Sequence, residues 1–269
     1  MNFMKSSIFS RGQVQKVPKE QALHGGVLAV WGSPSSGKTT VAVKIAKYLA
    51  DKKKNVVLVL CDTTAPMLPC ICPPSDLECE KSLGSILAAQ HVTESLVKYH
   101  MITHKKMDYL TILGMLKGEN EYSYAPYNET QAKELIASLR KISPFVIIDC
   151  GSYIASDILS AIALLNCDSM LRLANCDLKS ISYLSSQLSI LQTTGLDFEK
   201  QYKCASNVKS NHGIEHMAGT MGSLIFQIPH SDEVEQQYLE GNLFADLTLK
   251  DSREFRKEIE KIVKEVFGC

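Results

Sequence analysis

The sequence lacks several features that would place it in a class at once. Its 29 basic and 29 acidic side chains cancel, so bulk charge favours neither nucleic acid nor an anionic lipid surface as a partner. It has no apolar run of about 18 residues, which a membrane-spanning helix needs. Residues 1–15 contain no apolar run of signal-peptide length. We therefore expect a cytoplasmic protein, with any membrane contact peripheral.

The nine cysteines do not include a C-x₂-C pair, which zinc sites commonly use. Cys70, Cys72 and Cys79 form a C-x-C-x₆-C cluster, but no nearby histidine completes a ligand set. Other cysteines lie in apolar strand-like runs, where the residue behaves as a small buried hydrophobe. We interpret the cysteines as free thiols.

Short apolar runs alternate with amphipathic segments from Gly26 onward. Gly26–Trp31, Asn55–Leu60 and Phe145–Asp149 read as buried strands, whereas Thr39–Ala50 and Thr130–Lys141 show helical spacing. This alternation predicts an α/β fold with a mostly parallel sheet covered by helices on both faces, a three-layer domain. We expect one domain over residues 25–269, preceded by an arm at 1–24.

A complete G-x-x-x-x-G-K-[ST] phosphate-binding loop lies between the first strand and the first helix. Glycines permit a tight turn whose N–H groups face phosphate oxygens, and the helix start is positive. Lys38 is placed to reach the β- and γ-phosphates, and Thr39 to bind Mg²⁺. We assign nucleotide contacts to Gly32, Ser33, Pro34, Ser35, Ser36, Gly37, Lys38, Thr39 and Thr40.

Two aspartates end strand-like runs. Asp149 closes the run FVIID, where a carboxylate can hold a water on Mg²⁺ together with Thr39. The N–H of Gly151 follows and is a candidate sensor of the γ-phosphate. Asp62 ends the run NVVLVLCD and is predicted to lie at the carboxyl edge of the sheet, where ligands bind. We assign catalytic roles to Lys38 and Asp62 and metal binding to Thr39 and Asp149.

With these residues in place, the chain resembles the ParA/MinD family of P-loop ATPases. The likeness runs from about Gly26 to Leu247 and is carried by the phosphate loop and the segments VLVLCDTTAPMLP, CASNVK and QIPHSDEVEQQYLEGNLF. The resemblance implies that Asp62 is the switch aspartate that supports hydrolysis. It also implies that Asn207 contacts adenine, that the backbone at Pro229 lines the adenine pocket, and that ATP and Mg²⁺ are the cofactors.

Two positions depart from the family pattern. The family's signature lysine, which reaches a dimer partner's nucleotide, is replaced here by Ser33, and Leu60 replaces an acidic residue usual in the switch segment. The resemblance therefore predicts nucleotide binding but leaves the dimer-linked mechanism of hydrolysis open. Among the branches of the family, the chain looks closer to the CpaE/TadZ-like proteins of pilus and secretion systems than to a DNA-segregating ParA.

The main functional prediction is a slow ATPase that acts as a switch and positions or assembles a cellular machine. The predicted partners are ATP and ADP, a second copy of the chain when ATP is bound, and a protein of a membrane machine. DNA is not expected, since the basic runs Lys52–Lys54 and Lys105–Lys106 are short. The alternative is a nucleotide-binding scaffold with little or no hydrolysis. A small-molecule kinase would need an arginine-rich lid, and no such cluster is present.

Overall fold

The computed structural model describes residues 24–79, 81–193, 195–210, 219 and 221–268. The predicted arm at 1–24 lies outside these residues, except for His24. The described strands form one sheet of eight strands in the order β3-β4-β2-β5-β1-β6-β7-β8. Every neighbouring pair is parallel except β3 and β4, which are antiparallel.

The strands of the sheet have the following bounds: β1 Gly26–Gly32, β2 Val56–Leu60, β3 Ile102–His104, β4 Met107–Leu113, β5 Phe145–Asp149, β6 Ser169–Asn175, β7 Gln201–Val208 and β8 Phe226–Pro229. The longer helices are α1 Lys38–Asp51, α4 Glu94–His100, α5 Glu129–Ile142, α6 Ile158–Asn166, α7 Leu178–Thr193, α9 Asp232–Leu239 and α10 Arg253–Phe267. Short helical segments are α2 Leu68–Ile71, α3 Leu83–Leu87, η1 Pro74–Asp76 and η2 Phe198–Lys200.

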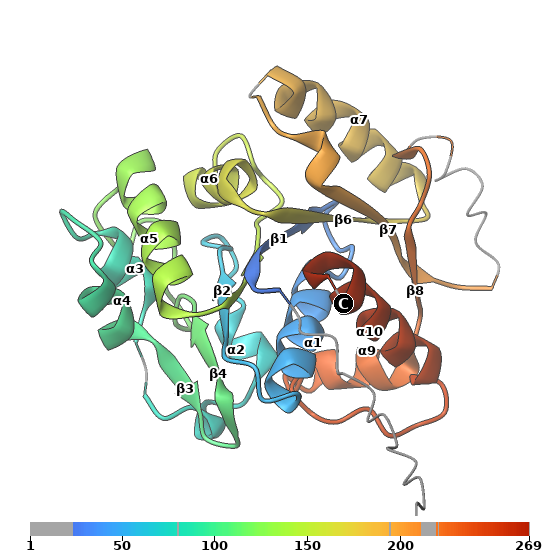
Figure 1. The fold of residues 1–269 in the computed structure, drawn as a ribbon, viewed down its shortest axis with the longest axis horizontal. Helices are drawn as coiled ribbons and strands as arrows, with labels where there is room; N and C mark the ends of the chain where they lie inside the picture. Colours follow the sequence, from blue (N-terminus) through green and yellow to red (C-terminus); the bar gives the residue numbers. More distant parts are fainter. Residues whose placement is uncertain (1–23, 80, 194, 211–218, 220, 269) are drawn as a thin grey trace, which may run out of the picture.

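Successive side chains of each central strand enter two different cores. In β1, Leu28 and Val30 pack with α1 and α10, whereas Val27, Ala29 and Trp31 pack with the core under α5 and α6. This alternation follows from the two-residue period of a strand and buries both faces of the sheet. Figure 1 shows the result, with α1, α9 and α10 on one face and α5, α6 and α7 on the other. The predicted three-layer α/β domain is confirmed.

The structure adds elements that the pattern did not reveal. Residues 63–79, whose Pro- and Thr-rich sequence shows no helical period, contain the short helical segments α2 and η1. The strand β3 was not predicted, because its three residues are too few to show a period. It pairs with β4 and makes that edge of the sheet antiparallel.

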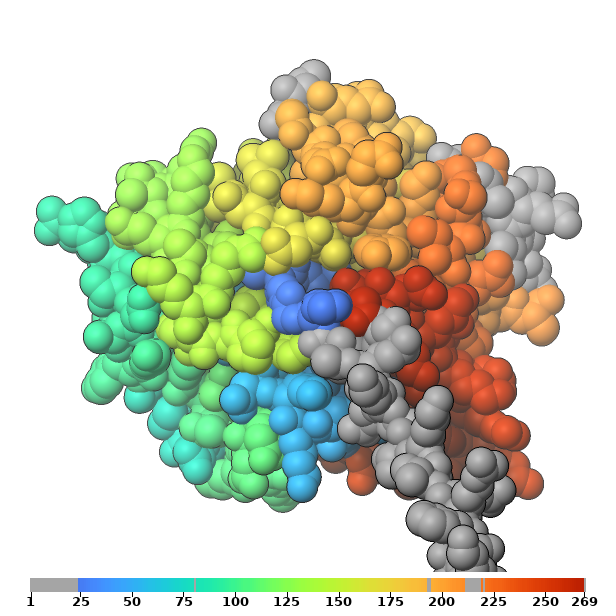
Figure 2. Space-filling model, viewed as in Figure 1, coloured from blue at the N-terminus to red at the C-terminus, as the bar shows by residue number. Residues whose placement is uncertain are grey.

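The last helix, α10, is packed against the sheet. Phe255, Ile259, Ile262, Val263 and Phe267 are buried, and the helix contacts β8 and α1. In Figure 2 the beginning of β1 lies beside α10, and the backbone N–H of His24 donates to the carbonyl of Phe267 at 2.7 Å. Among the described residues, no helix combines the length and apolarity needed to cross a bilayer.

Candidate functional site

The predicted phosphate loop forms a turn between β1 and α1 that only glycine permits at two points. Gly32 has φ 154°, and a Cβ there would lie 1.9 Å from the carbonyl oxygen of Leu173 on β6. Gly37 has φ 77° immediately before α1 begins at Lys38. Glycine adopts such backbone angles without steric cost. The loop is therefore held against the sheet, with the N-terminus of α1 at its end.

Lys38 extends its amine into the site. Nζ donates to Ser152 Oγ at 2.7 Å and to the carbonyl of Ser33 at 3.3 Å. Burial lowers the pKa of this amine, and the nearby Asp149 carboxylate opposes that shift. Both hydrogen-bond partners are neutral oxygens. The amine is thus held by neutral groups. A phosphate oxygen can replace them and would form a stronger hydrogen bond, because it is negatively charged.

Thr39 and Asp149 meet beside the lysine. The Thr39 hydroxyl donates to Asp149 Oδ2 at 2.6 Å, joining the start of α1 to the end of β5. The other carboxylate oxygen, Oδ1, is buried and has no hydrogen-bond partner. Burial raises the pKa of Asp149 to about 7, although the Thr39 bond and the Lys38 charge favour the ionised form. An orphaned buried carboxylate oxygen beside a hydroxyl is a donor set that suits hydrated Mg²⁺.

Asp62 lies just beyond the end of β2 and holds the loop that follows it. Its Oδ1 accepts from the backbone N–H of Thr64 at 3.0 Å and from that of Ala65 at 2.8 Å. The side chain also borders the cavity described below. The carboxylate therefore has two neighbours, the loop backbone on one side and the cavity on the other.

A cavity of about 860 Å³ brings most of the predicted site residues together. It is bordered by the predicted residues Pro34, Ser35, Gly37, Lys38, Thr39, Thr40, Asp62, Asn207 and Pro229. The remaining predicted residues, Gly32, Ser33, Ser36 and Asp149, are buried and do not border it. The cavity thus connects the phosphate loop with the ends of β7 and β8. Its size suits a nucleotide-sized ligand.

Ser33, the residue at the position of the family's signature lysine, is turned away from this cavity. Its side chain is 1% exposed, and its Oγ lies 2.8 Å from the Ser180 Oγ of α7. Its backbone N–H donates to the Leu173 carbonyl at 3.1 Å. The Ser33 side chain therefore contacts α7 rather than the cavity, and its carbonyl accepts from Lys38.

Several residues of the site were missed from the sequence. Ser152 Oγ accepts a hydrogen bond from the Lys38 amine. Asp157 borders the cavity near Asp62. Burial raises the pKa of the Asp157 carboxyl, which also accepts from the Ser160 N–H at 3.1 Å as the N-cap of α6. An aspartate before an apolar helical run is a capping signal, so nothing in the pattern predicts that Asp157 borders a ligand cavity.

The expected role of Gly151 takes a different form. Its N–H donates to Ser160 Oγ at 2.8 Å, and that hydroxyl is also bonded to the Asp157 carboxylate. The N–H is therefore engaged inside the domain in this structure. To contact a phosphate, the Gly151 N–H would have to break its hydrogen bond to Ser160 Oγ.

Comparison with known proteins gives a fold but no close sequence relative. No protein-family model matches the sequence, and no curated protein matches it. Solved structures do match. They include the cell division ATPase MinD of Pyrococcus furiosus, with TM-score 0.68 and 19% identity over 90% of this chain and 98% of that one. A ParA family ATPase from Chlorobium tepidum matches with TM-score 0.73 and 15% identity, over 89% and 98%.

A third structure carries a ligand. The septum site-determining protein MinD of Pyrococcus horikoshii, complexed with Mg-ADP, matches with TM-score 0.69 and 17% identity, over 90% of this chain and 96% of that one. The chain therefore has the P-loop fold of the ParA and MinD ATPases. Identity this low establishes the architecture alone.

Proposed function

We propose that the protein binds Mg-ATP in the cavity above the phosphate loop and hydrolyses it slowly, as a switch. The observation that carries the proposal is the junction of Thr39 and Asp149. A hydroxyl and a buried carboxylate with one unpartnered oxygen lie beside the Lys38 amine. These three groups supply a metal-binding pair and a phosphate-binding cation where the start of α1 meets the end of β5.

In this proposal each residue has a separate task. Lys38 exchanges its bonds to Ser152 and Ser33 for the β- and γ-phosphate oxygens. The Thr39 hydroxyl and the Asp149 carboxylate would hold hydrated Mg²⁺. The metal neutralises charge on the phosphates when it is bound. Asp62 orients the attacking water with the part of its carboxylate that faces the cavity.

The proposed nucleotide is ATP rather than GTP. Asn207 and Pro229 border the end of the cavity formed by β7 and β8. Guanine-specific P-loop proteins use an Asn-Lys-x-Asp run whose carboxylate reads the guanine N1–H and amine. Asn207 is followed here by Val208 and Lys209, and position 210 is Ser rather than Asp. Competition of GTP against bound ATP tests this, and equal displacement would contradict it.

The biological role proposed is the positioning or assembly of a cellular machine, of the pilus, secretion, division or partition kind. Nucleotide-dependent pairing of two copies, and a protein partner of a membrane machine, belong to the same proposal. A pull-down that compares the ATP-loaded with the nucleotide-free protein tests it.

A second function is supported by one contact. Ser33 is short, uncharged and buried against Ser180, so it supplies no charge toward a facing subunit. A positive charge donated across a dimer contributes about 10³–10⁵ in rate where it occurs in P-loop enzymes. Its absence favours a nucleotide-binding scaffold with little turnover.

Titration with labelled ATP, followed by single-turnover hydrolysis, tests the proposed function and separates it from the alternative. Lys38→Ala should remove ATP affinity, because N–H groups of the loop cannot replace its charge. Lys98→Ala, an exposed lysine on α4, is the matched control. Unchanged affinity in Lys38→Ala would overturn the assignment of the site, whereas wild-type binding without product formation would establish the scaffold.

A further inference from the structure

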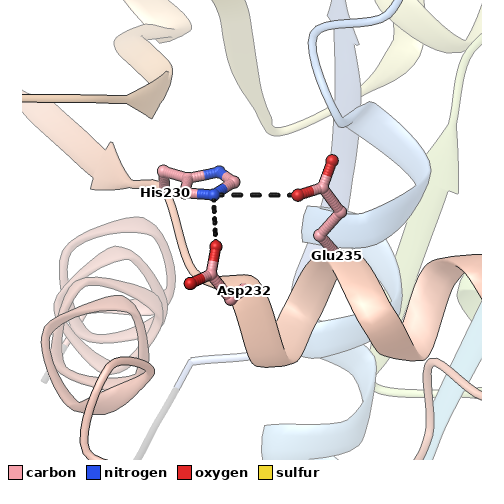
Figure 3. Close-up of side chains that lie close together, drawn as sticks. All are labelled: His230, Asp232 and Glu235. Carbon is pink, nitrogen blue, oxygen red and sulfur yellow. Dashed lines mark hydrogen bonds and ion pairs between the residues drawn. The ribbon is translucent and has the colours of Figure 1, made fainter.

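Three side chains of types that can bind a metal ion converge at the end of the cavity formed by β7 and β8. In sequence they are far from the phosphate loop. Figure 3 shows His230, which follows β8, with its ring facing Asp232 and Glu235 of α9. His230 Nε2 lies 2.9 Å from Asp232 Oδ1 and 3.7 Å from Glu235 Oε2. One ligand atom from each residue lies within 4.8 Å of the other two. His230 and Glu235 also border the cavity.

The backbone fixes the histidine in this position. The N–H of His230 donates to the Val208 carbonyl at 2.9 Å, which ties the residue to β7. Asn207 precedes Val208 and has φ 53°, in the left-handed region that asparagine tolerates better than most residues. This conformation brings Asn207 Oδ1 to 2.7 Å from His230 Nδ1. The ring is therefore held by a neighbouring strand, independently of α9.

The asparagine contact determines which ring nitrogen is free. An amide oxygen only accepts hydrogen bonds, so Nδ1 carries the hydrogen in the pair with Asn207. Nε2 lies 2.9 Å from Asp232 Oδ1, a separation that needs either a hydrogen on Nε2 or a cation shared with the carboxylate, and a bound metal ion meets this need. A histidine that donates its second nitrogen to an oxygen acceptor is the usual arrangement at protein metal sites.

We propose that His230, Asp232 and Glu235 bind a divalent transition-metal ion of the zinc class. Ligands about 2.0–2.1 Å from a tetrahedral zinc ion are about 3.4 Å apart, and the two observed separations from Nε2 lie on either side of that value. One neutral imidazole and two carboxylates carry two negative charges, which the ion balances. Three protein ligands leave a fourth position open to water or to a group in the cavity.

This site goes beyond the proposed ATP site and needs no nucleotide. It uses other residues than the Thr39–Asp149 pair, which is assigned to Mg²⁺. Asn207 contacts His230 and also borders the cavity. An ion on Nε2 would strengthen the Nδ1 bond and hold the Asn207 oxygen there, leaving its amide NH₂ to face a base. Metal binding therefore stiffens the base end of the cavity.

The test is a titration of the nucleotide-free, full-length protein with Co²⁺ and Zn²⁺. Cobalt reports its ligands by absorption, and a thiolate ligand adds a near-ultraviolet charge-transfer band. This band distinguishes the proposed nitrogen and oxygen site from the cysteines, of which Cys70 and Cys79 are partly exposed. We expect one equivalent of Co²⁺ bound without the thiolate band and displaced by Zn²⁺.

Variants assign the site. His230→Ala and Glu235→Gln should each lose this equivalent, while His91→Ala should keep it. His91 is a matched control because it is exposed and pairs with a carboxylate, that of Glu134. Asn207→Gly removes the amide but suits the left-handed backbone, and should weaken binding about 10- to 100-fold with all three ligands intact. Circular dichroism of each variant checks the fold.

Undiminished stoichiometry in His230→Ala, or a thiolate band in the wild type, would overturn the proposal. So would the absence of Co²⁺ binding, which would leave the cluster as a histidine hydrogen-bonded to Asp232. Lys38→Ala separates this test from that of the proposed function. It should bind Co²⁺ normally even if ATP affinity is lost, so the two proposals can fail independently.

Discussion

The side chains of Ser33 and Ser180 share a buried hydrogen bond of 2.8 Å, which joins the phosphate loop to α7. Ser33 therefore contributes to packing between the loop and the helix layer. The equivalent lysine implied by the family resemblance would place a charge at a position that is 1% exposed.

Substitution of Ser33 should accordingly affect stability more than turnover. Ser33→Ala leaves Ser180 without its partner and should cost about 1 kcal/mol of unfolding free energy. Ser33→Lys should cost more, because a buried charge gains no partner there. Urea unfolding of both variants measures this. A Ser33→Lys protein that is as stable as the wild type and hydrolyses ATP faster would mean that the loop can turn this side chain outward.

Asp62 should control the chemical step without controlling affinity. Asp62→Asn keeps an oxygen that can accept from Thr64 and Ala65, so the loop stays in place while the negative charge is removed. Single-turnover hydrolysis should fall about 10²-fold or more with ATP affinity unchanged. Asp62→Ala loses the loop bonds as well and serves for comparison. Undiminished hydrolysis in Asp62→Asn would place the water-orienting group elsewhere, and the neighbouring Asp157 would be the next residue to test.

The Thr39–Asp149 pair should set the dependence of ATP binding on Mg²⁺. Thr39→Ala removes the hydroxyl and should raise the Mg²⁺ concentration needed for half-maximal ATP binding, while Thr39→Ser should retain the wild-type value. Asp149→Asn should act in the same direction as Thr39→Ala. Titration of Mg²⁺ at fixed labelled ATP gives the midpoints, and equal midpoints in all four proteins would remove both residues from the metal site.

Lys44 gives the protein a predictable response to pH. It lies on α1, faces α9 and is 4% exposed. Its Nζ donates to Gln237 Oε1 at 2.5 Å and to the Ala245 carbonyl at 3.1 Å. Burial lowers the pKa of this lysine from 10.5 to about 7. Between these values the unfolded chain binds one more proton than the folded chain, so stability should rise with pH. The slope is at most about 1.4 kcal/mol per pH unit for one proton.

The measurement is urea unfolding of the wild type and Lys44→Met at several pH values from 7 to 9. The wild type should gain stability relative to Lys44→Met as pH rises, because removing the Lys44 proton on folding costs less as the pH approaches the ordinary lysine pKa of 10.5. Lys98→Met on the exposed face of α4 controls for the loss of a lysine in general. Parallel curves for wild type and Lys44→Met would show that Lys44 keeps its charge in the folded state.

Much of this architecture could be predicted because buried parallel strands are unmistakable in sequence. Residues 56–60 and 145–148 are apolar throughout and buried throughout, as a strand covered on both faces must be. The phosphate loop was equally clear, since its glycines and lysine occur at fixed spacing. The sequence could not reveal which way each side chain of the loop points. Its residue types alone do not say whether Ser33 faces a ligand or α7.

The groups missed from the sequence share a physical reason. Ser152 and Asp157 act through contacts between segments that only the fold brings together. Ser152, for example, is more than a hundred residues from Lys38 in the sequence. His230 was within a segment already singled out for its proline. Its relation to Glu235 depends on where α9 begins, and helix boundaries are the least certain part of a sequence pattern.

The two bonds from Asp62 to the backbone of Thr64 and Ala65 have a mechanical consequence. A carboxylate anchored in this way cannot shift toward a water in the cavity without pulling the loop after β2 along with it. The loop runs on to Met67, which packs at the edge of the core near Leu68. A displacement of the Asp62 carboxylate would therefore also displace the surface backbone that follows β2, so a change at the cavity and a change in the outer surface would occur together.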